Sequence, residues 1–190
     1  MQYVNNISIL THEVKQSKFI AHLLPYSQYE STLKLLKLEH PKARHFVTAY
    51  RYLNEFKQIV EHSSDDGEPK GTSGKPSLMV LQGQDIINSA VIVVRYFGGT
   101  KLGTGGLVRA YSDAVNLVLN EAVLVEYKNE ISKTIVIAYT DVRFVDYECE
   151  TYEITILEKT FDVKTRYRIK ASEDSMKSFL EKVDRVVKII

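Results

Sequence analysis

Glycines and cationic side chains gather in two short segments of this 190-residue chain, a combination typical of backbone that approaches an anion. We call residues 63–76 the first glycine loop and residues 98–106 the second glycine loop; together they hold eight of the nine glycines. Glycine permits close backbone approach, so each loop is expected to lie against a ligand, a phosphate or the other loop. The candidate residues of the first loop are Asp65, Asp66, Gly67, Glu68, Lys70, Gly71, Ser73, Gly74 and Lys75. Those of the second loop and its flanks are Arg95, Gly98, Gly99, Lys101, Gly103, Gly105, Gly106 and Arg109.

The second glycine loop is expected to bind an anion because it stands between a predicted strand and a predicted helix. Free N–H groups and the positive end of the helix dipole meet at such a junction. Lys101, with Arg95 and Arg109 on either side, would add charge-assisted contacts. The loop matches neither GxxxxGK[ST] nor the dinucleotide fingerprint, whose third glycine is replaced here by Val108. A tight crossover that needs glycine for packing alone is the alternative.

The first glycine loop offers three carboxylates, Asp65, Asp66 and Glu68, but not the spacing of a calcium loop. Ser73 with Lys75 as its base lacks a supporting signature for nucleophilic catalysis. Turn and capping roles explain most of these polar groups, and the carboxylates are alternatively expected to pair with cations of the second loop. The histidines show no metal-binding spacing, and His45 is interpreted as structural. We therefore predict no catalytic residue, no metal site and no cofactor.

A third candidate surface follows from alternating cations along one predicted strand near the end of the chain. Alternation places such side chains on one face of a sheet, where they would follow a phosphate backbone. The alternative, which we favour, is a solvated face neutralised by acids such as Glu153 and Glu158, since no aromatic stacking platform accompanies the cations. This possible nucleic-acid face consists of Lys164, Arg166, Arg168 and Lys170.

The elements that must position these residues suggest two domains. The apolar run 90–97 predicts a central strand buried on both faces, and apolar spacing predicts a helix directly after the second glycine loop. Beyond residue 130 the order βαββαβ, with Ser172 capping the second helix, predicts a ferredoxin-like unit. We place the boundary near residues 126–131, which gives domains 1–127 and 128–190. Further strands are expected at 18–26, 43–53 and 56–62, and a short helix near 78–81. Ser27 and Glu30 are expected to cap another helix, whose apolar face carries Leu33, Leu35, Leu36 and Leu38. A strand beyond residue 130 is expected to carry Ile131, Ile135, Ile137 and Tyr139.

Composition narrows the classes of partner only slightly. The chain carries 25 basic and 24 acidic side chains, a net charge of +1, so any basic surface must be local. The single cysteine, Cys149, excludes an internal disulfide and fits a reducing compartment. The N-terminus does not read as a signal peptide, and no apolar run is long enough to span a membrane. We therefore expect a cytoplasmic protein with no membrane partner.

Four stretches of the sequence resemble the YigZ/IMPACT family. They are SSDDGEPKGTSGKP from Ser63, RYFGGTKLGTGGLVRAYSDAV from Arg95, ARHFVTAYR from Ala43, and EVKQSKFIA near the N-terminus. The resemblance implies a two-domain α+β fold. Its N-terminal domain would be like the second domain of a small-subunit ribosomal protein, domain four of elongation factor G and GHMP kinases, and its C-terminal domain like domain five of elongation factor G. Val47 stands where the family commonly has cysteine, which weakens any expectation of thiol chemistry there.

The resemblance also directs the functional hypothesis, because eukaryotic relatives regulate translation by competing for an activator of a starvation-responsive kinase. We expect a non-catalytic regulatory or binding protein that contacts RNA, the ribosome or a translation factor through the second glycine loop. One alternative is an enzyme or sensor that binds a nucleotide or phosphorylated metabolite at the same loop. Another is a protein-interaction adaptor that binds no nucleic acid. The oligomeric state stays open.

Overall fold

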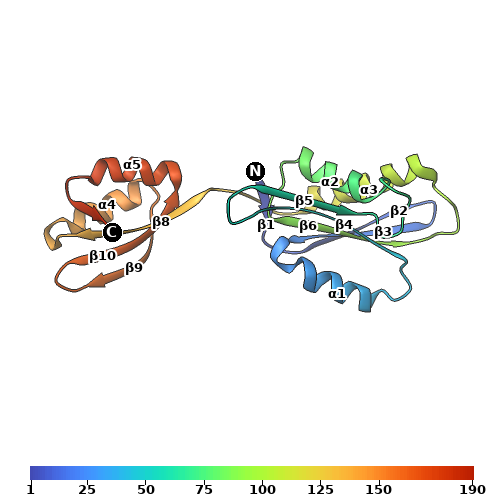
Figure 1. Cartoon of the computed structure of the whole chain (residues 1–190), viewed down its shortest axis with the longest axis horizontal. Helices are drawn as coiled ribbons and strands as arrows, with labels where there is room; N and C mark the ends of the chain where they lie inside the picture. Colours follow the sequence, from blue (N-terminus) through green and yellow to red (C-terminus); the bar gives the residue numbers. More distant parts are fainter. The chain divides into compact units, whose positions relative to one another are not determined.

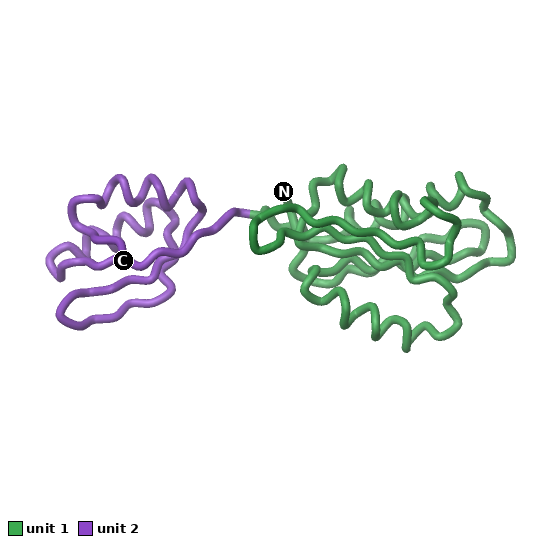
Figure 2. Tube along the Cα trace, in the orientation of Figure 1, with its two compact units in different colours: residues 1–127 green, residues 128–190 purple.

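The computed structural model describes residues 1–190, which form two compact units, Met1–Tyr127 and Lys128–Ile190 (Figure 2). We call them the N-terminal unit and the C-terminal unit. Each encloses hydrophobic side chains of its own, because no core cluster mixes residues of the two units. The predicted two-domain α+β fold is confirmed.

The N-terminal unit is built on a five-stranded antiparallel sheet. Its central strand, β6, is buried at every residue but the last, as the apolar run at 90–97 predicts for a strand covered on both faces. Phe97 lies beyond the end of this strand and is 55% exposed. The strands follow the order β2 (Ser8–Val14), β3 (Ser17–Pro25), β6 (Ser89–Tyr96), β4 (His45–Leu53) and β5 (Ile59–Ser64).

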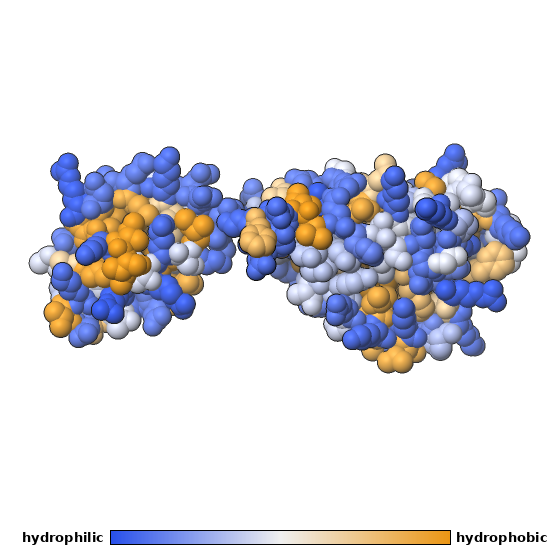
Figure 3. Space-filling view, in the orientation of Figure 1, coloured by the Kyte–Doolittle hydropathy of each residue, from blue (hydrophilic) through white to orange (hydrophobic).

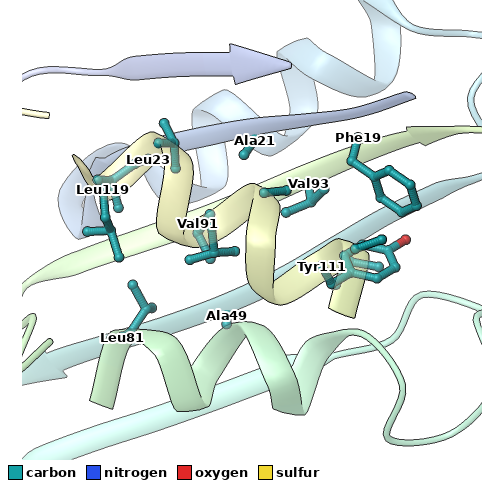
Figure 4. Close-up of a cluster of buried hydrophobic side chains, with 14 of the residues drawn as sticks. Phe19, Ala21, Leu23, Ala49, Leu81, Val91, Val93, Tyr111 and Leu119 are labelled. Carbon is teal, nitrogen blue, oxygen red and sulfur yellow. The ribbon is translucent and has the colours of Figure 1, made fainter. Parts of the chain in front are cut away.

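Helices cover both faces of this sheet (Figure 1). Helices α2 (Gly74–Gly83) and α3 (Gly103–Glu121) lie on one face, and α1 (Tyr29–Glu39) lies on the other. The larger core fills the α2–α3 side, where Phe19 of β3 packs edge-on against Tyr111 of α3 at 5.0 Å between ring centroids (Figure 4). The first and last strands of the unit, β1 (Gln2–Val4) and β7 (Leu124–Glu126), pair with each other and so bring its two ends together.

Two predictions about α1 are wrong. Ser27 does not cap the helix: Tyr26–Gln28 form a 3-10 turn after Pro25, and α1 starts at Tyr29 without a side-chain cap. Leu36 is buried and Leu33 partly so, but Leu35 and Leu38 are 52% and 78% exposed. At about 100° per residue, positions 33 and 36 share one face of a helix while 35 and 38 share the opposite one.

The C-terminal unit has the predicted order βαββαβ on a four-stranded antiparallel sheet, β11-β8-β10-β9. Ser172 caps α5 as expected, because its Oγ accepts a hydrogen bond from Ser175 N at 3.1 Å. Tyr139 differs from the prediction: it lies in a 3-10 turn after the strand and is 55% exposed. The elements are β8 (Glu130–Ile137), α4 (Val142–Thr151), β9 (Thr155–Phe161), β10 (Thr165–Ser172), α5 (Glu173–Val183) and β11 (Val187–Ile189).

Gly98, the first residue of the second glycine loop, lies directly against the turn between β2 and β3. A Cβ built on it would lie 2.0 Å from the carbonyl carbon of Gln16 and 2.2 Å from Ser17 N. Its own N–H donates to Ser17 Oγ at 3.0 Å. The end of β6 is thus held against the neighbouring turn by contact that leaves no room for a side chain.

The variant Gly98→Ala is therefore expected to lower the free energy of unfolding by at least about 2 kcal/mol, because backbone atoms must move to admit the methyl group. Gly105→Ala is the matched control, since nothing lies within 4 Å of its built Cβ. Urea denaturation should show the control within about 1 kcal/mol of the parent. Equal stabilities of the two variants would contradict the packing described here.

Candidate functional site

Asp65 organises the first glycine loop. Its carboxylate accepts hydrogen bonds from the backbone N–H groups of Gly71, Ser73 and Gly74 at 2.7, 3.1 and 2.8 Å. It also accepts a hydrogen bond from the Ser73 hydroxyl at 2.7 Å, and Ser73 is fully buried. The loop therefore closes around this carboxylate, and the Ser73 hydroxyl is committed to it instead of standing free as a nucleophile.

Asp66 ties the same loop to the start of β4. Its Oδ2 accepts Phe46 N–H at 2.7 Å, and its carbonyl oxygen lies 2.9 Å from His45 Nδ1. Both aspartates are thus engaged in holding backbone. The structure contains no group of three or more His, Cys, Asp or Glu side chains placed to hold a metal ion.

Glu68, the third carboxylate, forms a buried ion pair with Arg95 on β6. Their side chains are 3% and 7% exposed, and the same Glu68 Oε1 accepts the hydroxyl of Tyr111 at 2.9 Å. Burial raises the pKa of Tyr111 well above its usual value, and the neighbouring Glu68 carboxylate raises it further. These three side chains join the first glycine loop to β6 and to α3.

A pocket of about 450 Å³ lies where the two glycine loops meet. Glu68 and Pro69 of the first loop line it, as do Lys101, Gly103 and Thr104 of the second. Helix α3 starts at Gly103, and no side chain caps that end. Uncapped N–H groups therefore open at the pocket beside Lys101, an arrangement suited to a negatively charged group.

Sequence comparison identifies this combination of loops. The profile of the Impact N-terminal domain matches residues 15–119, more than half of the chain, and spans both loops. The chain belongs to the IMPACT family. The resemblance read from the four sequence stretches is thereby confirmed.

Relatives in the IMPACT family differ in how much of them this chain covers. An IMPACT family member of Haemophilus influenzae is 36% identical over 177 residues, covering 90% of this chain and 84% of that protein. IMPACT family member YigZ of Escherichia coli is 40% identical over 115 residues, covering 59% of this chain and 56% of YigZ. IMPACT family member YvyE of Bacillus subtilis is 39% identical over 122 residues, covering 62% and 55%. The aligned part thus spans little more than half of the latter two relatives.

Solved structures support the fold. A crystal structure of a hypothetical protein matches with a TM-score of 0.64 at 26% identity, covering 100% of this chain and 95% of the other. A structure of the two-domain translational regulator Yih1 matches with a TM-score of 0.39 at 27% identity over 62% of this chain and 46% of that one, too low a score to inform on fold or function. None of the helices in this IMPACT family chain is long and apolar enough to cross a bilayer.

Several candidate residues from the sequence lie outside the pocket. Arg109 is exposed on α3, and Lys70 and Lys75 are exposed on the first loop, but none of them lines it. The sequence interpretation missed Arg44 and Phe97, which do line it, and treated His45 as structural only. His45 is brought to Arg95 by the pairing of β4 with β6. Only strand register, which no local pattern encodes, could have placed it there.

The predicted cationic face of the C-terminal unit is present in part. Arg166 and Arg168 project from the exposed side of β10, while Thr165, Tyr167 and Ile169 are buried. Glu158 lies 3.6 Å from Arg168, and Glu130 pairs with Lys170, whereas Arg166 forms no ion pair. Lys164 precedes the strand. Two of the three alternating cations on the strand itself, Arg168 and Lys170, thus lie beside acids on neighbouring strands.

The surface of the C-terminal unit is also not uniformly polar. Figure 3 shows hydrophobic residues gathered around the C-terminus on the face seen there. Ile189 and Ile190 are 48% and 62% exposed. Apolar side chains and cations therefore share the surface of this unit, which is less favourable for a phosphate backbone than a continuous basic face.

Asp65→Asn is expected to destabilise the N-terminal unit most at neutral pH. Burial raises the pKa of Asp65, but its hydrogen bonds, led by the one from Gly71 N–H, outweigh burial and hold the pKa below its usual 3.8. A carboxyl with a depressed folded pKa contributes stability above its unfolded pKa and loses it as pH falls through the folded pKa. We expect a loss of about 1.5–3 kcal/mol at pH 7, from urea denaturation followed by NMR amide signals of this unit.

The same measurement in acid tests whether the charge of Asp65 carries this stability difference. The difference between parent and variant should shrink below about pH 4, because protonation removes the charge from the parent as well. Glu55→Gln, at the exposed turn between β4 and β5, serves as the control and should change stability little at any pH. A difference that stays constant down to pH 2 would show that Asp65 acts through shape and not through charge.

Proposed function

We propose that this IMPACT family chain is a non-catalytic regulatory or binding protein in translation that contacts RNA, the ribosome or a translation factor through the second glycine loop. The link to translation is supported by family membership, since eukaryotic relatives regulate translation. The anionic contact is supported by the site itself. Fold-level analogy to translation factors adds no information on the ligand.

The observation that carries the anionic contact is the uncapped start of α3 at the pocket. Helix α3 has 19 residues, and its first N–H groups are left without side-chain partners. Lys101 and Arg44, both exposed, line the same pocket. Helix N–H groups, the helix dipole and two cations all favour a phosphate oxygen at this place.

A binding role is favoured over catalysis because the polar side chains of the first loop are occupied. Asp65, Asp66 and Ser73 hold backbone or one another, and Glu68 is paired with Arg95. None of them is left with the geometry of a nucleophile and its base. The exposed cations of β10, with Arg166 free of ion pairing, would supply a second and weaker contact to nucleic acid.

The central test is charge reversal at the pocket. Lys101→Glu should weaken binding to ribosomes or ribosomal RNA at least about tenfold at low salt and reduce the salt dependence, because one phosphate contact is lost. Arg109→Glu should have a smaller effect, since Arg109 does not line the pocket. Lys34→Glu is the matched control: this exposed lysine lies on α1, on the opposite face of the sheet from α2 and α3 (Figure 1).

Binding would be followed by fluorescence anisotropy or cosedimentation at several salt concentrations. If Lys101→Glu binds ribosomes and RNA as the parent does, the proposed contact is wrong. A pull-down from lysate with and without nuclease then identifies the alternative: a partner retained after nuclease treatment indicates a protein-interaction adaptor.

A further inference from the structure

Phe97 gives the pocket an aromatic wall. It is 55% exposed, it lines the pocket, and the Arg95 guanidinium lies 5.8 Å from its ring centroid. An exposed ring beside a cation is the kind of platform on which nucleobases stack. Inorganic phosphate alone would leave this wall unused.

Arg95 lines the same pocket and carries an unsatisfied donor. Its side chain is 7% exposed and pairs with Glu68 through Nη1, but Nε is buried without a hydrogen-bond partner. A buried N–H left without an acceptor costs about 1–3 kcal/mol. Nε itself is closed to solvent, so what Arg95 offers a ligand is its fixed positive charge at the pocket wall.

His45 presents the complementary acceptor. Its Nδ1 lies 2.9 Å from the Asp66 carbonyl oxygen, which can only accept, so in the neutral ring Nδ1 carries the proton. Nε2 is then an acceptor, and it has no partner within the protein. Since His45 lines the pocket, a hydroxyl or amino group of a ligand is the matching donor.

These features, together with the anion site at α3, describe one class of ligand. We propose that the pocket binds a nucleoside phosphate, with its base on Phe97 and its phosphate at the start of α3. This inference rests on the anion site proposed above. Such a molecule carries an aromatic base for Phe97, ribose hydroxyl donors for His45 Nε2 and an anion for Lys101 and the start of α3. The pocket volume of about 450 Å³ lies within the range of about 300–1,000 Å³ usual for small-molecule sites. The ligand would be a free nucleotide or the phosphorylated end of an RNA strand.

The test compares ligands that carry different parts of this chemistry. The full chain would be titrated calorimetrically with the four nucleoside 5′-monophosphates, the corresponding nucleosides, ribose 5-phosphate and inorganic phosphate. At least one nucleoside monophosphate should bind about tenfold more tightly than ribose 5-phosphate, because base stacking is added. Short RNAs with and without a 5′-phosphate, competed against that nucleotide, distinguish a strand end from a free nucleotide.

Variants of Phe97 then test whether the base stacks on this ring. Phe97→Leu should abolish the advantage of the nucleotide over ribose 5-phosphate, while Phe97→Tyr should retain it. The matched control is Phe161→Leu, a 59% exposed ring in the C-terminal unit, which should change nothing. Thermal unfolding of each variant confirms that the fold is intact.

Failure of this inference is distinguishable from failure of the proposed function. If ribose 5-phosphate binds as tightly as every nucleotide, or if Phe97→Leu leaves nucleotide binding unchanged, the base does not stack on Phe97. RNA or ribosome binding that still depends on Lys101 would then leave the proposed function standing. If phosphates, RNA, ribosomes and translation factors all fail to bind in a Lys101-dependent way, both proposals are wrong.

Discussion

The Glu68 carboxylate meets the Arg95 guanidinium and the Tyr111 hydroxyl in the interior beside the pocket, and the position of the first glycine loop depends on this contact. Each side chain comes from a different element: the first glycine loop, β6 and α3. A buried charge without its partner costs about 3–5 kcal/mol, so neither charged member is tolerated alone. The ion pair therefore fixes where the first loop lies relative to the strand and the helix.

Arg95 links this structural role to the open pocket. One of its nitrogens is committed to Glu68, and its guanidinium lies over the rings of Phe19 in the core and Phe97 at the pocket, at 5.4 and 5.8 Å. A charge held this firmly loses little conformational entropy when a ligand arrives. It also cannot move out to follow a flexible partner, which favours a ligand that enters the pocket over one that only touches its rim.

Sequence patterns predicted those elements whose signals are local and strong. The apolar run of β6, the spacing along α3 and the cap at Ser172 each specify one outcome. The predicted start of α1 was wrong because the 3-10 turn after Pro25 takes up the residues that a capping box would need. Within the pocket, the glycine loops were visible in sequence. The positions of His45 and Arg44 beside them were not, because they depend on the register between β4 and β6.

The glycines themselves separate into two kinds once their surroundings are known. Gly98 and Gly74 approach backbone of the protein itself, with built Cβ atoms 2.0 and 2.7 Å from their nearest neighbours. Gly103 and Gly105, at the start of α3, have nothing within 4 Å of theirs. Packing explains the first kind, and backbone conformation explains Gly103, whose φ is +72°. Neither explains Gly105, where an alanine would fit without a clash and would favour the helix. A ligand approaching the N–H groups of α3 would gain from the absence of a side chain at Gly105, which agrees with the anion contact proposed above.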